Sequence, residues 1–128
     1  MPTRVGIDLV SVQTVSEAVG RFSDRYLGRV YTETELADCR TPAGVDAGRL
    51  AARFAAKEAA LKVLRPRAEV AVPLRTIEVR RDAHGAPELH LHGSTAALAA
   101  AADLRGWSVS LTHEGDYASA VVAAEARA

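Results

Sequence analysis

The sequence predicts an α+β domain in which one long central helix packs on a mainly antiparallel sheet. Three observations support this fold. A short β-branched run, 5–12, lies near the N-terminus, and apolar residues recur with a helical period over 50–64. Two later segments, 75–92 and 107–124, alternate polar and apolar residues on either side of a turn, which is typical of β-hairpins.

The length of 128 residues is that of one domain, which we expect to span 1–128. The single cysteine, Cys39, excludes an internal disulfide and a cysteine-rich metal site. The N-terminus lacks the basic start and long apolar core of a secretion signal, and no apolar run approaches the ~18 residues that cross a bilayer. We therefore expect a cytoplasmic protein that does not interact with membranes.

The net charge is zero, but the charges are unevenly distributed. The segment 49–81 holds nine Lys or Arg against three Glu, a local charge of +6. This asymmetry predicts an anionic ligand or partner near the centre of the chain. Because aromatic residues are few and do not alternate with basic ones, the sequence does not suggest nucleic-acid binding.

The N-terminal run 5–12 is apolar on both parities, as in a strand that is covered on both faces, and Asp8 is its exception. A buried carboxylate is costly unless it is paired or binds a metal. Asp8 therefore belongs either to a partly exposed turn or to a functional site.

An amphipathic helix follows over 16–27, with an interruption expected near Gly20. Arg21, Arg25 and Arg29 recur at four-residue intervals along its other side. These arginines form either a solvated face or a docking surface for an acidic protein.

A second, short helix is predicted over 33–39 by a capping box, with Thr32 as N-cap and Glu35 reaching back to it. The segment 41–46 is then a loop. The long helix starts at Asp46 or just after it.

The long helix carries charges where a plain core helix would not. Lys57 lies inside the apolar stripe of the helix, and Glu58 lies at the edge of that stripe, one turn before Lys62. Either Glu58 and Lys62 form an ordinary surface pair, or they belong to a site. Pro66 ends the helix. The apolar stripe consists of Leu50, Phe54, Leu61 and Leu64.

In the first hairpin, the turn lies at 82–87. His90 and His92 share the polar side with Glu88, and without a third ligand at a suitable spacing we expect them to face solvent rather than a metal. An alanine-rich helix should then run over 95–105.

That helix is capped by Gly93-Ser94 and closed by Gly106. The second hairpin pairs 107–113 with 117–124. His113 has the parity of the buried row and lies where the strand meets its turn. It is therefore either a core histidine satisfied by the backbone or a functional one.

Four motifs occur in order along the chain. They are Gly6-Ile7-Asp8, the segment 53–62, Asp82 with Gly85 and Pro87, and the segment 110–114. With these motifs at family-like spacing, the sequence resembles the holo-acyl-carrier-protein synthases, the short single-domain 4′-phosphopantetheinyl transferases. The likeness runs from about residue 4 to residue 125.

This resemblance implies transfer of the phosphopantetheine arm of coenzyme A to a serine of an apo acyl carrier protein, with release of adenosine 3′,5′-bisphosphate. Asp8 and Glu58 match the two magnesium-binding carboxylates of the family, in line with the preference of Mg²⁺ for oxygen ligands. Glu58 or a metal-bound water would take the serine proton. Lys62 matches the family lysine that is suited to the phosphates.

The resemblance also places Arg53, Lys57 and His113 in matching blocks, as coenzyme-binding or site-supporting residues together with Lys62. Catalytic roles are expected for Glu58, Lys62 and His113. Family members are typically homotrimers with coenzyme A in clefts between subunits, and we expect the same assembly here.

Two departures from the family pattern concern binding. Gln13-Thr14 stands where the family often has a basic residue that grips the acidic carrier protein, so Arg21 or Arg25 would substitute. The loop 65–70 replaces a glycine-containing loop near the nucleotide, and the contacts of that family loop do not carry over to this chain.

The alternative function is a non-catalytic oligomeric module that binds a nucleotide or an acidic carrier protein. Whether the carrier serves fatty-acid or specialised biosynthesis is open.

Overall fold

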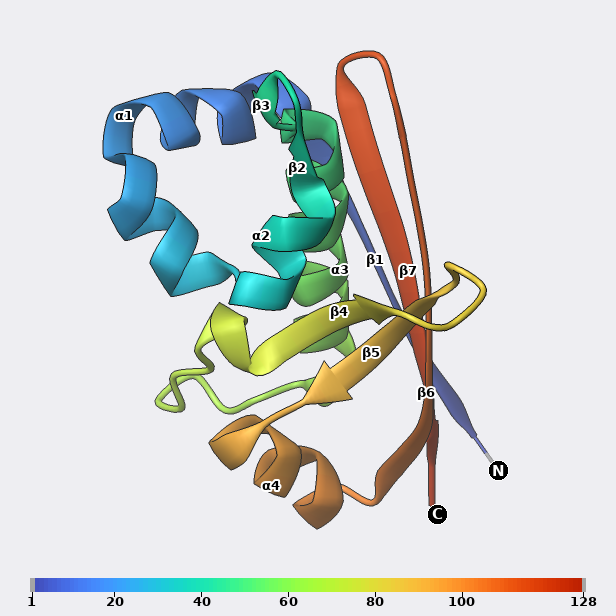
Figure 1. Cartoon of the computed structure of the whole chain (residues 1–128). Coiled ribbons are helices and arrows are strands. Elements are labelled where there is room, and N and C mark those ends of the chain that lie inside the picture. Colours follow the sequence, from blue (N-terminus) through green and yellow to red (C-terminus); the bar gives the residue numbers. More distant parts are fainter. Residues whose placement is uncertain (1, 128) are drawn as a thin grey trace.

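A three-stranded antiparallel sheet lies along one side of the molecule, and one long helix packs against it (Figure 1). The computed structural model describes residues 2–127. Strand β7 (Tyr117–Ala126) lies between β1 (Thr3–Ser11) and β6 (Leu104–Glu114), and helix α3 (Ala47–Leu64) packs against one face of the sheet. The α+β fold with a helix on an antiparallel sheet is thus confirmed.

Strand β1 approaches α3 so closely that one position must be glycine. A Cβ atom on Gly6 would lie 2.0 Å from the carbonyl oxygen of Ala59 in α3. Side chains alternate along a strand, so the even-numbered residues Arg4 and Asp8 share the face of β1 on which Gly6 meets the helix. The strand therefore presents Asp8 to α3 with almost no space between the two backbones.

Helix α3 permits this approach because its buried positions are mostly alanine. Six alanines in its central part have no exposed surface. Small side chains let neighbouring backbones come close, and alanine also has the most favourable helix propensity. The six are Ala51, Ala52, Ala55, Ala56, Ala59 and Ala60.

The predicted ends of α3 are confirmed. Asp46 is the N-cap, and its side chain accepts a hydrogen bond from the backbone N–H of Arg49. The helix ends at Leu64, and Arg65 adopts a left-handed conformation (φ 51°) directly before Pro66. Among residues 2–127, no helix combines the length and the apolar character that a bilayer crossing requires.

Helix α1 (Val12–Val30) is longer than the predicted segment 16–27, because the Ser11 side chain caps it at an earlier residue. It is interrupted at Ser23 (φ 48°, ψ −125°), whereas the interruption was expected near Gly20. Helix propensity points to glycine as the weak position, but here the break falls on serine, which has no strong local signal for a left-handed backbone.

The short helix α2 (Glu33–Cys39) begins with the predicted capping box. The Thr32 hydroxyl accepts from the Glu35 N–H, and the Glu35 carboxylate accepts from the Thr32 N–H. The segment predicted as a loop before α3 contains a small hairpin of β2 (Arg40–Thr41) and β3 (Gly44–Val45).

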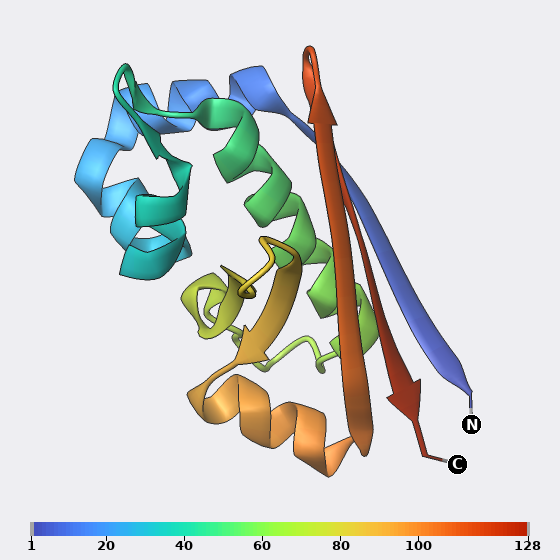
Figure 2. The same ribbon diagram turned by 45° about the vertical axis from the view of Figure 1, so that its right-hand side comes forward.

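The predicted first hairpin is confirmed as β4 (Ile77–Arg81) and β5 (Pro87–Leu91), which follow the short 3-10 helix η1 (Leu74–Thr76). These two strands form a separate small sheet, and β5 lies against β6 (Figure 2). His90 and His92 were expected to face solvent: His92 is exposed and His90 is half-buried. The His92 Nε2 also lies 2.8 Å from Glu78 Oε1.

The last helix, α4 (Gly93–Ala101), is shorter than the predicted 95–105, and its N-cap is His92 without a side-chain cap. Asp103 adopts a left-handed conformation (φ 56°) that ends the helical region before β6 begins. Gly106, expected to close the helix, instead lies in β6 at an irregularity of the pairing between Arg105 and Ser108. A run of alanines carries no local signal for its own end, which explains the error.

Charged side chains hold the other side of α3. The fully buried Lys57 ammonium donates to Glu35 Oε1 (2.8 Å) and to the carbonyl oxygens of Leu74 and Ile77. Burial lowers the pKa of Lys57, and the negative charge of Glu35 opposes that decrease. Glu35 Oε2 also accepts from the Val79 N–H (2.9 Å), so one carboxylate joins α2, α3 and β4.

Substituting Gly6 by alanine tests the close approach of β1 to α3. Because the added Cβ would overlap a backbone oxygen, we expect the free energy of unfolding of Gly6→Ala to fall by about 2 kcal/mol or more in urea denaturation. Gly20→Ala is the matched control, since its Cβ would meet nothing within 4 Å, and we expect it to be neutral or slightly stabilising. Equal stability of the two variants would contradict the packing described here.

Candidate functional site

Strand β1 and helix α3 bring Asp8, Glu58 and Lys62 together at the surface. The Lys62 ammonium donates to the carbonyl oxygen of Ile7 (2.7 Å) and lies 3.5 Å from Asp8 Oδ1. Glu58 is half-buried one helical turn before Lys62. Residues that are fifty positions apart in the chain thus form one charged cluster, as the sequence motifs predicted.

The two carboxylates influence each other electrostatically. Partial burial raises the pKa of Glu58, the negative charge of Asp8 raises it further, and Lys62 partly offsets these effects. Two acids face a single lysine here, so the cluster carries an excess of negative charge. A cation between the carboxylates would remove that excess.

The donor set of this cluster fits Mg²⁺. Asp8 and Glu58 supply carboxylate oxygens, and within residues 2–127 no group of three or more His, Cys, Asp or Glu side chains is arranged for a metal. Mg²⁺ is commonly bound through one or two carboxylates, with water and substrate phosphates as its other ligands. The residues present therefore suit magnesium better than a metal that needs an all-protein cage.

Lys62 is placed to contact an anion. Its side chain is 56% exposed, whereas the Asp8 side chain is 21% exposed. An exposed ammonium that is tethered to a backbone carbonyl keeps its charge near the carboxylates and still faces solvent. A phosphate group that approaches the two acids would therefore meet Lys62.

His113 lies at the opposite end of α3 from Lys62. It is exposed near the end of β6, and a Cβ atom on Gly48, in the first turn of α3, would lie 2.9 Å from His113 Nδ1. The core-histidine alternative is thus wrong. Among residues 2–127, no hydrogen bond or ion pair joins His113 to the Asp8 cluster, so its catalytic and coenzyme-binding roles stay predictions.

Lys57 is not available to a ligand. Its ammonium has no exposed surface and is already bound to Glu35 and two backbone carbonyls. The expectation that Lys57 binds the coenzyme directly is therefore wrong, and the site-supporting role that the same motif suggested is the one its contacts support.

Arg53 is also largely buried, with 5% of its surface exposed. Its Nη1 donates to the Arg49 carbonyl oxygen (3.3 Å), and its buried Nε has no partner among the described residues. Its coenzyme-binding role stays a prediction.

The acids Glu35 and Glu78 were not singled out as site-supporting residues. The Glu78 carboxylate accepts hydrogen bonds from the Thr32 hydroxyl and from Arg80 Nε (2.7 Å). It is also hydrogen-bonded to His92. Burial acts to raise the pKa of Glu78, but these hydrogen bonds together lower it. The capping box was a signal for Glu35, whereas nothing local in the sequence marked Glu78.

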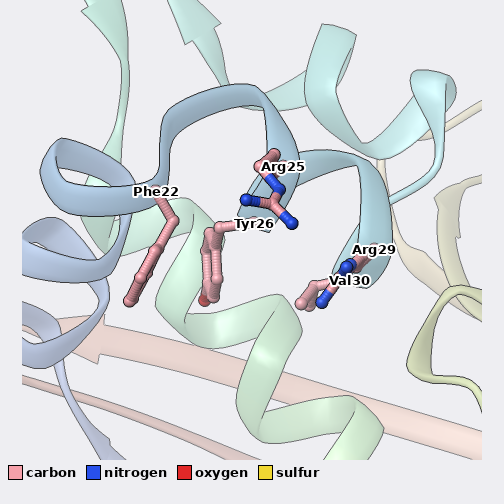
Figure 3. A pocket seen from close by; sticks show the side chains of 5 residues that line it. All are labelled: Phe22, Arg25, Tyr26, Arg29 and Val30. Carbon is pink, nitrogen blue, oxygen red and sulfur yellow. The ribbon is translucent and has the colours of Figure 1, made fainter.

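Two cavities of the structure have arginines in their walls. One of about 320 Å³ lies on α1 and is lined by Phe22, Arg25, Tyr26, Arg29 and Val30, which Figure 3 shows along the second half of the helix. The other, of about 520 Å³, lies at the C-terminal end of α3 next to Arg4 and Arg65. Both combine apolar walls with arginines.

Comparison with known proteins identifies the family. The model of the 4′-phosphopantetheinyl transferase superfamily matches residues 4–122. The holo-(acyl-carrier-protein) synthase of Herpetosiphon aurantiacus is 43% identical over 123 residues, which cover 91% of this chain and 94% of that protein. The corresponding protein of Koribacter versatilis is 39% identical over 120 residues, which cover 94% and 95%.

Solved structures agree with these relatives. A complex of acyl carrier protein synthase with CoA from Chronobacterium ammoniagenes superposes with a TM-score of 0.83 at 29% identity over the full length of both chains. The holo-(acyl-carrier-protein) synthase of Neisseria meningitidis gives 0.82 at 32% identity, covering 94% of this chain and 96% of that one. The chain therefore belongs to the 4′-phosphopantetheinyl transferase superfamily, among the holo-acyl-carrier-protein synthases.

Proposed function

We propose that this protein transfers the 4′-phosphopantetheine arm of coenzyme A to a serine of an apo acyl carrier protein and releases adenosine 3′,5′-bisphosphate. Relatives that carry this activity in their names cover more than nine-tenths of the chain. The observation that carries the proposal is the cluster of Asp8, Glu58 and Lys62, where two carboxylates and an exposed ammonium meet at the surface. Such a cluster suits a diphosphate with its divalent cation.

Each residue of the cluster has a separate role in the proposed reaction. Asp8 and Glu58 would hold Mg²⁺, which supplies charge neutralisation for the diphosphate when it is bound. Lys62 contacts a phosphate oxygen and stabilises the charge that develops on the leaving group. Glu58 lies beside Asp8 in the cluster, where its carboxylate is placed to accept the serine proton.

The proposed reaction forms one phosphorus–oxygen bond and breaks another. The serine oxygen of the carrier attacks the phosphorus that bears the pantetheine arm, and the serine proton passes to Glu58. The bond from that phosphorus to the bridging oxygen of the diphosphate breaks. The bridging oxygen and its electron pair leave with adenosine 3′,5′-bisphosphate, and a phosphodiester joins pantetheine to the carrier.

Replacing Glu58 tests the activity and the role of the cluster. Glu58→Gln keeps the size of the side chain but removes its charge and its basicity, so we expect kcat to fall by about 10²–10⁴-fold. The measurement is the gain in mass of an apo carrier after incubation with coenzyme A and Mg²⁺. Excess chelator should abolish the gain with the unaltered protein.

Glu88→Gln is the matched control, because Glu88 is an exposed glutamate on β5, away from the cluster. If Glu58→Gln were as active as the control, Glu58 and Lys62 would be an ordinary surface ion pair without a role in the reaction. If the unaltered protein binds coenzyme A in a calorimetric titration but modifies no carrier from a diverse panel, the alternative of a non-catalytic binding module would replace this proposal.

We further propose a homotrimer, as the family resemblance implies. All the helices lie on one side of the β1–β7–β6 sheet, and the opposite face is open (Figure 2). That open face exposes large apolar side chains: Val5, Ile7 and Leu9 of β1 with Tyr117 and Val121 of β7. The pairing of Ile7 with Val121 places these residues side by side. A contiguous apolar patch of this kind is typical of an interface, and a copy of the same chain is the occupant that we propose.

Introducing charge on this open sheet face tests the assembly. We expect Ile7→Lys to dissociate the trimer to single chains in sedimentation velocity, because Ile7 is 58% exposed in one chain and would be buried in the assembly. Val70→Lys is the control, since Val70 is an exposed apolar residue of the loop after α3, outside this face. A trimer that survives Ile7→Lys would place the interface elsewhere.

Carrier docking is proposed for α1. Arg21, Arg25 and Arg29 are exposed. The cavity on this helix combines two of them, Arg25 and Arg29, with the apolar side chains of Phe22 and Val30 (Figure 3). An acidic partner with an apolar side chain at its contact surface fits this arrangement. Exposed charges act mainly on the rate of association, and at ordinary ionic strength salt screens their attraction beyond a distance of ~8–10 Å.

Charge reversal on α1 tests carrier docking. We expect Arg21→Glu/Arg25→Glu to raise the KM for the carrier and to weaken its salt dependence, while the KM for coenzyme A stays unchanged. Arg105→Glu/Arg127→Glu makes the same change of charge at two other exposed positions and should leave the carrier KM unaffected. An unaltered carrier KM and salt dependence in the α1 variant would move the docking surface to the basic segment 49–67.

A further inference from the structure

A buried ion pair between α2 and α3 has no part in the proposed reaction. The Lys57 ammonium lies 2.8 Å from Glu35 Oε1, and neither side chain has exposed surface. We propose that Glu35 is a positioning residue, which acts through Lys57 to hold Glu58 in the direction that lets it share a cation with Asp8. The inference rests on the proposed function and deepens it by giving a residue of α2 a role in the acidic cluster.

The polar atoms of this pair are all hydrogen-bonded. The Lys57 ammonium directs its three N–H donors to Glu35 and to two backbone carbonyl oxygens, one in η1 and one in β4. Glu35 Oε1 also accepts from the backbone N–H of the α2 N-cap, and Oε2 accepts from a backbone N–H of β4, both at 2.9 Å. A buried network in which every group is satisfied rigidifies its surroundings. Lys57 is therefore fixed against α2, η1 and β4 at the same time.

The position of Lys57 on the helix determines where Glu58 points. Successive helical residues are about 100° apart around the axis, so Glu58 lies about 100° from Lys57, and Ala59 about 200°. Strand β1 contacts α3 on the Ala59 side, where a Cβ atom on Gly6 would also lie 3.1 Å from Lys62 Cβ. Glu58 lies between these two roughly opposite faces, so a rotation of α3 about its axis would move the Glu58 carboxylate relative to β1.

Lys57 is the large buried side chain in this part of α3. Over the stretch 54–62, the buried residues are Lys57 and four alanines. A methyl group has no long side chain that interdigitates with its neighbours, so alanines define the rotation of a helix less firmly than a side chain with fixed partners. The ion pair supplies that fixed point on the face of α3 that is roughly opposite to β1.

Stability alone does not require a charged pair at this place. Replacement of a buried ion pair by apolar side chains of similar size is often neutral or stabilising, because the charges no longer have to be removed from water. Apolar contacts are not directional, whereas the hydrogen bonds from one ammonium to three acceptors are. The ion pair therefore fits a positional role better than a role in stability.

Magnesium binding tests the inference, because it reports on the acidic cluster without any transfer reaction. One test variant, Glu35→Asp, keeps the charge but shortens the side chain by one methylene. The other, Glu35→Gln/Lys57→Met, leaves no unpaired buried charge. Mg²⁺ is titrated calorimetrically into the full chain in the presence of coenzyme A, without a carrier protein and at a temperature at which the variants are folded. We expect the Kd for Mg²⁺ to rise about tenfold in both variants.

Val15→Ala is the control for a general loss of stability. Val15 is buried in a cluster with residues of the N-terminal half of α3, away from the acidic cluster. Loss of two buried methyl groups should lower the melting temperature but leave the contacts of Glu35 and Lys57 intact. Because a protein that stays folded binds its ligand without a penalty from reduced stability, we expect the Kd for Mg²⁺ to equal that of the unaltered protein.

Three results would overturn the inference. If both test variants bind Mg²⁺ as tightly as the unaltered protein, the ion pair supports only the fold. If Val15→Ala weakens Mg²⁺ binding equally, reduced stability explains the effect. If the unaltered protein binds no Mg²⁺, there is no metal centre to position. Should the double variant fail to fold, the Kd of Glu35→Asp decides.

Failure of the proposed function is a separate result. A protein that modifies no carrier, but whose Glu35 variants lose affinity for Mg²⁺, would retain the positioning role. A protein that modifies carriers, but whose Glu35 variants bind Mg²⁺ with unchanged affinity, would retain the proposed function without it.

Discussion

The direct contact between the backbone of β1 and an alanine-rich helix determines the geometry of this molecule. With glycine at position 6 and alanine at position 59, the strand lies against α3 without side chains to separate them. Every functional group on the inner face of β1 is consequently held at a fixed offset from α3. Asp8 meets Lys62 at one point, and Arg4 meets the Val63 carbonyl at another.

The opposite side of α3 is held by charge rather than by close packing. Lys57 and Glu35 are fully buried, and together they bind backbone groups of η1, β4 and the start of α2. Breaking such a buried pair by removing one partner typically costs about 3–5 kcal/mol, because the other charge is left without compensation. Since Glu58 follows Lys57 in the helix, the contacts that fix Lys57 also fix the direction in which Glu58 points.

Features with a local physical cause were predictable from the sequence. The Thr32 capping box and the Asp46 cap depend on residues within one helical turn, and both lie where the sequence indicated. The break at Ser23 and the early end of α4 have no such local cause in the sequence, because neither a serine nor a run of alanines marks the end of a helix.

The features of the candidate site also differ in how far the sequence predicted them. The prediction that Asp8 and Glu58 lie together came from the family motifs and not from periodicity, because no local pattern relates residues fifty positions apart. Periodicity had indicated burial for Lys57, since it fell within the apolar stripe, and the structure agrees with that pattern rather than with a ligand contact. The ion pair with Glu35 could not be read from the sequence, because it joins side chains 22 positions apart on two different helices.

The pairing of β1 with β7 has a consequence for synthesis of the chain. Asp8 lies opposite Ala120, so the strand that carries Asp8 has its sheet partner more than a hundred positions later in the sequence. Ribosomes extend chains at about 5–20 residues per second, so β1 waits several seconds or more for β7 to be made. The helices can form during that interval, whereas the sheet that holds Asp8 in place can be completed only after β7 emerges from the ribosome. The proposed reaction centre is thus completed only after β7 has been made, so we expect no transfer to a carrier protein by a nascent chain that lacks β7.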